Sequence, residues 1–181
     1  MALSKFEVAW GSNLVVAPEG TLPPELKFLE SVGLPSPLVY GDVKWPGRIS
    51  FEQVGVALET VESFLGEEDT GDPTQRLLVI GEEDYEGGAA ALWCIEPSSA
   101  NVVRFDIDTG VLKLVNATPE NLGEALLVLR DWVLVGPESR HVEGLRRALG
   151  AIGAGSPHWL EFCAYVDSLP GADVIFRVAD V

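Results

Sequence analysis

Between residues 76 and 115 the hydrophobic pattern changes its period, and this change limits the possible folds more than any other feature. The stretches RLLVIG and AAALWCIE are short continuous apolar runs, whereas NVVRFDI and VLKLV alternate apolar and polar residues. Continuous runs are typical of strands covered on both faces, and alternation is typical of strands with one wet face. Because the connections are too short for crossover helices, the four segments are predicted to form an antiparallel meander with the first two strands central.

Helices are expected on both sides of the meander. The clearest begins at Pro119, after the capping residue Thr118, and its apolar residues repeat at intervals of four, three and four: Leu122, Leu126, Leu129 and Val133. Further helices are expected over 21–33, over 137–149 and, after a glycine-rich linker, within 156–171. The predicted fold class is therefore α+β, with N-terminal and C-terminal helices packed on a mainly antiparallel sheet.

Two segments before the meander have weaker patterns. Residues 33–48 are rich in Pro and Gly and are predicted to form an irregular connection over the surface. Residues 51–65 have apolar residues at helical spacing, but Gly55 and several β-branched valines weaken the pattern, so helix is only slightly favoured there. A chain of 181 residues with 47% hydrophobic content is expected to fold as one globular domain, 1–181.

The chain is strongly acidic, with 28 Asp and Glu against 12 Lys and Arg and a formal charge of -16. Nucleic-acid binding is disfavoured, because a phosphate backbone would be repelled. The first residues, MALSKFEVAWGSN, lack an apolar core of signal-peptide length, and Arg130 and Asp131 interrupt the most apolar stretch. Neither secretion nor a membrane span is predicted. Cys94 and Cys163 lie in apolar contexts typical of reduced thiols, which favours the cytoplasm.

No strong catalytic motif is present. Asp108-Thr109-Gly110 resembles the loop that aspartic proteases use in pairs, but a single copy between two predicted strands is better explained as a hairpin turn. His158 is predicted to be a surface residue at a helix start, and the apolar context of Cys163 raises the pKa of its thiol. We therefore expect no catalytic residues and no enzymatic activity.

Acidic residues are concentrated around one predicted strand, 76–81. Between Glu52 and Glu86 there are eleven of them, against Arg76 alone. The run at 82–86 lacks the spacing of a calcium loop, so a solvated turn is expected, with no metal or cofactor. A concentrated negative surface without catalytic groups suits the capture of a basic protein partner. The candidate partner-binding residues lie at 67–72, at 82–86 and at one later position: Glu67, Glu68, Asp69, Asp72, Glu82, Glu83, Asp84, Glu86 and Asp106.

The order of several segments resembles a known family. The strings LPPELKFLESVGLP, LLVIGEEDYEGGAAALWCIEPSSANVVRFDIDTGVLKLVNATPENLGEALLVL and HWLEFCAYV are similar, in this order, to bacterial immunity proteins of the SUKH superfamily, especially its fourth group. The matching segments, roughly 22–35, 77–133 and 157–168, cover a little over half the chain. The extra polar loop SSAN and the acidic insertion before Arg76 depart from the pattern.

The resemblance implies a curved sheet with helices around it, no catalytic residues, and neutralisation of a toxin delivered between competing bacteria, often a nuclease or deaminase. The acidic turns would then engage and occlude a basic substrate cleft of the toxin. Two alternatives stay open. One is a regulatory scaffold of the same superfamily with a cellular partner. The other is an enzyme, which would require His158, Cys163 and Asp108 to converge in one pocket.

Overall fold

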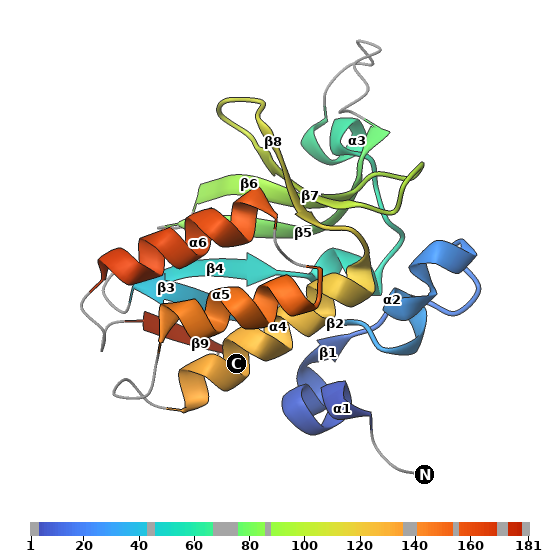
Figure 1. Ribbon diagram of the computed structural model, residues 1–181. Coiled ribbons are helices and arrows are strands. Elements are labelled where there is room, and N and C mark those ends of the chain that lie inside the picture. Colours follow the sequence, from blue (N-terminus) through green and yellow to red (C-terminus); the bar gives the residue numbers. More distant parts are fainter. Residues whose placement is uncertain are drawn as a thin grey trace.

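The computed structural model describes residues 4–42, 46–66, 76–85, 88–135, 141–153, 156–169 and 174–178. Within these ranges the largest element is a seven-stranded sheet with the strand order β8-β7-β6-β5-β4-β3-β9, in which every neighbouring pair is antiparallel. Its strands are β3 (Leu38–Asp42), β4 (Pro46–Ser50), β5 (Leu78–Tyr85), β6 (Gly88–Ile95), β7 (Val102–Asp106), β8 (Leu112–Asn116) and β9 (Val174–Val178). Figure 1 shows that the sheet is curved and that helices lie along its inner side.

The helices fall into an N-terminal group and a C-terminal group. The first contains α1 (Lys5–Trp10), α2 (Lys27–Ser31) and α3 (Val61–Leu65), together with three short 3-10 turns at Gly11–Asn13, Pro24–Leu26 and Glu52–Gly55. The second contains α4 (Pro119–Leu134), α5 (Val142–Ala151) and α6 (Pro157–Ser168). Two short strands, β1 (Leu14–Val15) and β2 (Leu34–Pro35), pair separately. The predicted α+β class, with a mainly antiparallel sheet packed by terminal helices, is confirmed.

The predicted meander is confirmed as β5 to β8, with β5 at the middle of the sheet and β8 at its edge. The Asp-Thr-Gly segment forms the β7–β8 turn, as expected. Gly110 has a φ of +69°, a conformation that costs glycine little, and its N–H donates to the Asp106 carbonyl at 2.9 Å. The Asp106 carboxylate accepts from the backbone N–H of Thr109 at 3.0 Å, which fixes the turn from within.

The C-terminal helices begin where side-chain caps were expected. The hydroxyl of Thr118 accepts a hydrogen bond from the Asn121 N–H at the start of α4, and the hydroxyl of Ser156 accepts one from the Trp159 N–H at the start of α6. Both helices have Pro at the first helical position, where its missing N–H has no cost. Leu122, which is fully buried, belongs to the main core that α4 forms with the inner face of the sheet.

Several sequence predictions need correction. The described residues of 33–48 do not form an irregular surface connection, because they contain β2, β3 and the start of β4, and Leu34 and Leu38 are fully buried. Over 51–65 there is no continuous helix, since a 3-10 turn and α3 are separated by an extended segment. The helix expected over 21–33 is shorter than predicted and begins with a 3-10 turn. Three further elements, α1, β1 and β9, were not predicted.

Two apolar clusters cover the two faces of the sheet. The larger one lies on the inner face, under α4, α5 and α6, and includes Trp93 and Trp159. The smaller one lies on the outer face, where Val61 of α3 packs with Val79, Leu92 and Cys94. Both cysteines are free and buried, as predicted. Among the described helices, none has both the length and the apolar character needed to cross a membrane.

Close packing at Gly81 in β5 gives a stability prediction. A Cβ atom at this position would lie 2.6 Å from the Ser50 backbone oxygen and 2.7 Å from the Phe51 ring. Gly81→Ala should therefore lower the free energy of unfolding by about 3 kcal/mol, because backbone cannot move aside cheaply. Gly144→Ala is the matched control, since a Cβ there meets nothing within 4 Å and Ala favours the helix by about 0.5 kcal/mol. Urea denaturation of both variants tests this, and equal effects would contradict it.

Candidate functional site

A cavity of about 370 Å³ opens between the inner face of the sheet and α6. Strands β3, β4, β5, β7 and β8 contribute its walls on one side, and α6 contributes the other. The cavity combines charged groups with aromatic rings: it is lined by Tyr40, Gly41, Gly47, Glu83, Arg104, Lys113, His158, Glu161, Phe162 and Tyr165. This combination, together with its size, is typical of ligand-binding pockets.

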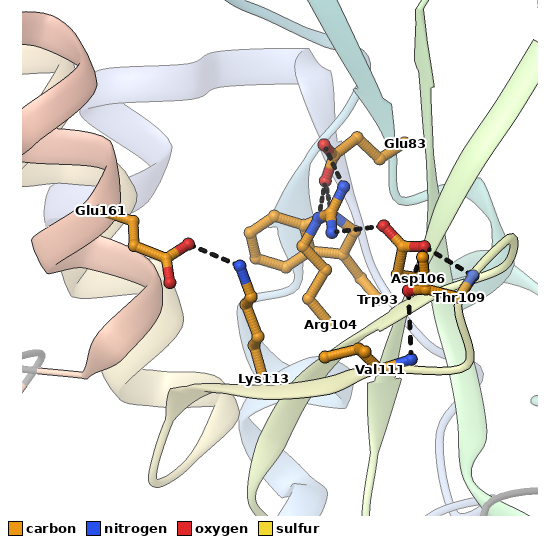
Figure 2. Close-up of polar contacts among 8 residues, drawn as sticks. All are labelled: Glu83, Trp93, Arg104, Asp106, Thr109, Val111, Lys113 and Glu161. Carbon is orange, nitrogen blue, oxygen red and sulfur yellow. Dashed lines mark hydrogen bonds and ion pairs between the residues drawn. The ribbon is translucent and has the colours of Figure 1, made fainter.

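The most buried charge of the cavity is the carboxylate of Glu83, whose residue is only 2% exposed. The carboxylate accepts hydrogen bonds from the Trp93 indole N–H at 2.9 Å, from Arg104 Nε at 2.8 Å and from Arg104 Nη2 at 3.0 Å. Figure 2 shows the resulting bidentate arrangement, with the indole on the same carboxylate. Two parallel charge-assisted bonds fix both the position and the orientation of the guanidinium group.

A bulge in β5 explains why Glu83 faces inward. Val79 faces the outer cluster, and uninterrupted alternation would place residue 83 on the same outer face. The pairing of β5 with β6 shifts register between Val79 and Gly81, so that Glu83 pairs with Ala91 and with Ile49 of the inner core. One extra residue in a strand reverses which face the following side chains occupy. The bulge therefore converts an acid that would be solvated into the centre of a buried ion pair.

The pKa of Glu83 results from opposing effects. Burial raises the pKa of the carboxyl, whereas the hydrogen bond and the charge of Arg104, with hydrogen bonds from Tyr40 and Trp93, lower it. The net direction is downward, so the group stays ionised at neutral pH. Arg104 also lies 3.6 Å from the Asp106 carboxylate through Nη1.

A second ion pair closes the cavity on its solvent side. Lys113 Nζ of β8 donates to Glu161 Oε2 of α6 at 2.5 Å, as Figure 2 shows. This hydrogen bond lowers the pKa of Glu161. The side chain of Glu161 is 60% exposed, so the pair contributes little to stability, about 0 to 1 kcal/mol.

His158 lies in the wall of the cavity, and its prediction as a surface residue is wrong. Its ring packs edge-on against Trp93, with centroids 5.2 Å apart, and against Trp159, with centroids 4.7 Å apart. Burial lowers the pKa of His158 to about 4, so the imidazole is neutral at pH 7. His158 is the second residue of α6, which begins at Pro157 after the N-cap Ser156.

The acidic candidates do not form one surface. Glu82, Glu83 and Asp84 lie in β5, not in a turn, and Glu83 is buried, so its prediction as a partner-contacting residue is wrong. Glu82 and Asp84 alternate with Glu83 and face the outer side, opposite Ser50 and Arg48 of β4. The remaining candidates lie outside the described residues: Glu67, Glu68, Asp69, Asp72 and Glu86.

Asp106 has a structural role that the sequence did not indicate. Its carboxylate accepts from the Thr109 hydroxyl at 2.6 Å and from the Thr109 N–H at 3.0 Å. These bonds lower the pKa of Asp106, which pairs inward with Ala91. The carboxylate of Asp106 is therefore engaged by Thr109 of the hairpin and by the nearby Arg104.

The three residues that an enzyme would have to bring together are not all at the cavity. Of the three, only His158 lines it. Cys163 is buried in the inner core, where burial raises the pKa of its thiol, and Asp108 is exposed at the β7–β8 turn. Among the described residues, no group of three or more His, Cys, Asp or Glu side chains is arranged to hold a metal ion.

Arg104 was missed by the sequence reasoning, although a signal was present. In NVVRFDI, Arg104 shares its face with the buried Val102, while Val103 and Phe105 occupy the other face. A charge on the same face as a core residue indicates a buried partner. The partner, Glu83, could not be identified without knowing the bulge.

The outer face carries a second feature, an apolar strip at the β7–β8 hairpin. Leu112 and Leu114 of β8 are 40% and 42% exposed, although they pair with the half-buried Phe105 and Val103 of β7. One cross-strand row joins this strip to an acid, in the order Glu82, Leu92, Phe105 and Leu112. We call this surface the outer strip, and it consists of Val103, Phe105, Ile107, Leu112 and Leu114.

Breaking the inner ion pair should be costly. Arg104→Met leaves the Glu83 carboxylate buried without its cation and should lower the free energy of unfolding by about 3 to 5 kcal/mol. The double variant Glu83→Leu/Arg104→Met should recover most of that loss, because no uncompensated charge remains. Lys113→Met, which breaks the exposed pair, is the control and should cost under about 1 kcal/mol. Denaturant unfolding measures all three, and an Arg104→Met effect no larger than the control would contradict the role of the pair.

His158 predicts a pH dependence. Its folded-state pKa is lowered from 6.5 to about 4, so its contribution to stability is complete above pH 6.5 and is lost as the pH falls towards 4. The unfolded chain then binds a proton that the folded chain does not. His158→Phe, which keeps a ring against Trp93, should remove about 3 kcal/mol of the wild-type dependence between pH 7 and 4. His141→Gln should keep it. Urea unfolding between pH 7 and 4 measures this dependence. If the free energy of unfolding of His158→Phe changes with pH as steeply as that of the wild type, His158 is not the responsible group.

Comparisons of the chain with protein-family models, with curated proteins and with solved structures found no match. The grounds for a function are therefore the geometry of the cavity, the composition of the two sheet faces and the charge of the chain.

Proposed function

We propose that this chain is a non-catalytic, cytoplasmic protein-binding domain that captures a partner with a basic and partly apolar surface. The SUKH resemblance makes the preferred form of this proposal an immunity protein that binds a toxin and occludes its basic cleft. The observation that carries the proposal is the outer strip, because contiguous exposed apolar side chains on a folded domain mark interaction surfaces.

The position of the outer strip suits a protein partner. Leu112 and Leu114 belong to β8, the edge strand of the sheet, whose outer side chains are only partly covered. α3 packs over the middle of the same face through Val61, beside Val79 and Cys94, while Leu112 and Leu114 at the hairpin are 40% and 42% exposed. An apolar centre bordered by polar residues is the usual composition of an interface.

The negative charge of the chain favours a partner with a basic surface. Glu82 and Asp84 lie on the same face as the strip, and the exposed Asp108 lies at the tip of the hairpin. With a formal charge of -16, the whole chain attracts a basic protein over long range and accelerates its approach. In this mechanism the overall field steers the partner, while the outer strip supplies the contact energy.

The alternative is a scaffold that binds a cellular protein through the same surface. The two forms differ only in the partner, so genomic context distinguishes them. A toxin gene next to this one supports the immunity form. A cellular protein that binds the outer strip, with no toxin gene nearby, supports the scaffold form.

Calorimetry with the product of the neighbouring toxin gene tests the proposal. Leu112→Lys/Leu114→Lys should raise the dissociation constant by roughly 30-fold or more, because each buried leucine contributes about 1 kcal/mol and the added charges repel a basic partner. Raising the salt concentration should weaken the wild-type association.

The matched control is Val8→Lys/Val16→Lys, which adds the same two charges at residues 70% and 42% exposed. Val8 belongs to α1, which Figure 1 shows far from the β7–β8 hairpin, and Val16 directly follows β1. The control should bind nearly as well as wild type. An equal loss in both variants would attribute binding to net charge alone and would refute the role of the outer strip.

A further inference from the structure

We propose that the cavity between the inner face of the sheet and α6 binds a small aromatic anion, whose carboxylate or phosphate group meets Lys113 and His158 while its ring lies against Phe162 and Tyr165. This site lies on the inner face, so it is independent of the partner surface at the outer strip, and either proposal can fail without the other.

The walls of the cavity combine aromatic rings with charged side chains, and the two kinds of group meet where Tyr40 hydrogen-bonds the Glu83 carboxylate. Tyr40, Phe162 and Tyr165 supply rings, and Gly41 and Gly47 expose bare backbone beneath them. A Cβ on Gly41 would lie 3.9 Å from the Tyr165 ring, so the absence of a side chain at residue 41 leaves room in the cavity beside this ring. A volume of about 370 Å³ accommodates a single substituted ring.

The hydrogen bonds that the charged side chains of the cavity already make favour an anionic ligand over a cationic one. The Glu83 carboxylate already accepts from Trp93 Nε1 and twice from Arg104, so its charge and its oxygens are occupied. It therefore has little to offer a cationic ligand. Arg104 lines the cavity beside Glu83, and its positive charge opposes the attraction of this carboxylate for a cation.

Two residues that line the cavity, Lys113 and His158, still have N–H groups to donate to a ligand. Lys113 has three N–H groups, and its bond to Glu161 uses one of them. Among the described residues, the imidazole of His158 has ring contacts but no hydrogen-bond partner. A neutral imidazole offers one N–H donor, so the cavity presents N–H groups from two elements to an oxygen acceptor.

Glu161 occupies the place that the anionic group of a ligand would take. It is 60% exposed and reaches Lys113 from α6 across the cavity mouth. Because an exposed pair of this kind is weak, a ligand carboxylate or phosphate can displace Glu161 into solvent and take over Lys113. This competition gives a distinctive expectation: removing the charge of Glu161 should strengthen anion binding.

Phenyl phosphate is the probe, and benzylamine, with the same ring and opposite charge, is the comparison ligand. Titration by NMR of the amide signals of β8 and α6 should give a dissociation constant on the order of 0.1 mM for phenyl phosphate, a ligand of about eleven heavy atoms. Benzylamine should bind at least about tenfold more weakly.

Three variants sharpen the test. Lys113→Met should weaken phenyl phosphate binding about tenfold, since it removes a charged hydrogen bond, and Glu161→Gln should strengthen it severalfold. Lys27→Met, which removes a 47% exposed side chain from a separate ion pair with Glu30, should leave it unchanged. Both cavity variants change exposed side chains, and an unchanged thermal unfolding transition confirms their fold.

The opposite pattern would overturn the proposal. No binding of phenyl phosphate at 10-fold above the expected dissociation constant, or benzylamine binding as tightly, would exclude an anion site. Equal affinity of Glu161→Gln and wild type would exclude competition at Lys113. An equal loss of affinity for phenyl phosphate in Lys27→Met and Lys113→Met would show that the overall charge of the chain, and not the position of Lys113, determines binding.

Discussion

The buried ion pair between Glu83 and Arg104 constrains the register of three neighbouring strands, β5, β6 and β7. A carboxylate taken out of water is unfavourable unless its oxygens are hydrogen-bonded, and here the donors come from β6 through Trp93 and from β7 through Arg104. A slip of one residue in either pairing would turn a charged side chain to the opposite face and leave its partner uncompensated. The pair thus adds little net stability while making the alternative registers costly.

The same constraint explains why the two faces of the sheet differ. On the inner face, α6 cannot pack flat on the strands because Glu83 and Arg104 lie beneath it, and the cavity occupies the space between them. On the outer face, α3 covers the middle of the sheet through an apolar cluster around Val61, whose N–H also donates to the Leu77 carbonyl at 2.9 Å. At the β7–β8 hairpin, Leu112 and Leu114 are partly exposed. The inner face therefore combines a buried ion pair with aromatic rings, whereas the outer face has apolar residues at the β7–β8 hairpin with Glu82 and Asp84 on the same side of the sheet.

Local signals in the sequence were sufficient for the meander and for the capped helices. Thr118 with Pro119 and Ser156 with Pro157 mark helix starts through neighbouring residues alone, and alternation in 101–107 identifies a strand without its partner. The strands β3 and β4 were not predicted because the segment 33–48 contains several Pro and Gly residues, although Leu38 is buried and pairs with Val178 of β9. Their pairing is long-range, and no local pattern encodes it. The cavity was missed for the same reason, since it joins β5, β7, β8 and α6.

The acidic cluster shows how proximity in sequence and position on a surface can differ. Glu82, Glu83 and Asp84 are consecutive, yet the register with β4 sends Glu83 inward and its two neighbours outward. One residue therefore serves folding, and the adjacent two remain available to solvent and partner. Because Leu112, Leu114, Glu82 and Asp84 contribute little to the inner core, their side chains can change without disturbing the ion pair that fixes the sheet. A domain that must match a changing partner gains from this separation, since partner choice can alter on the outer face while the inner face keeps the fold.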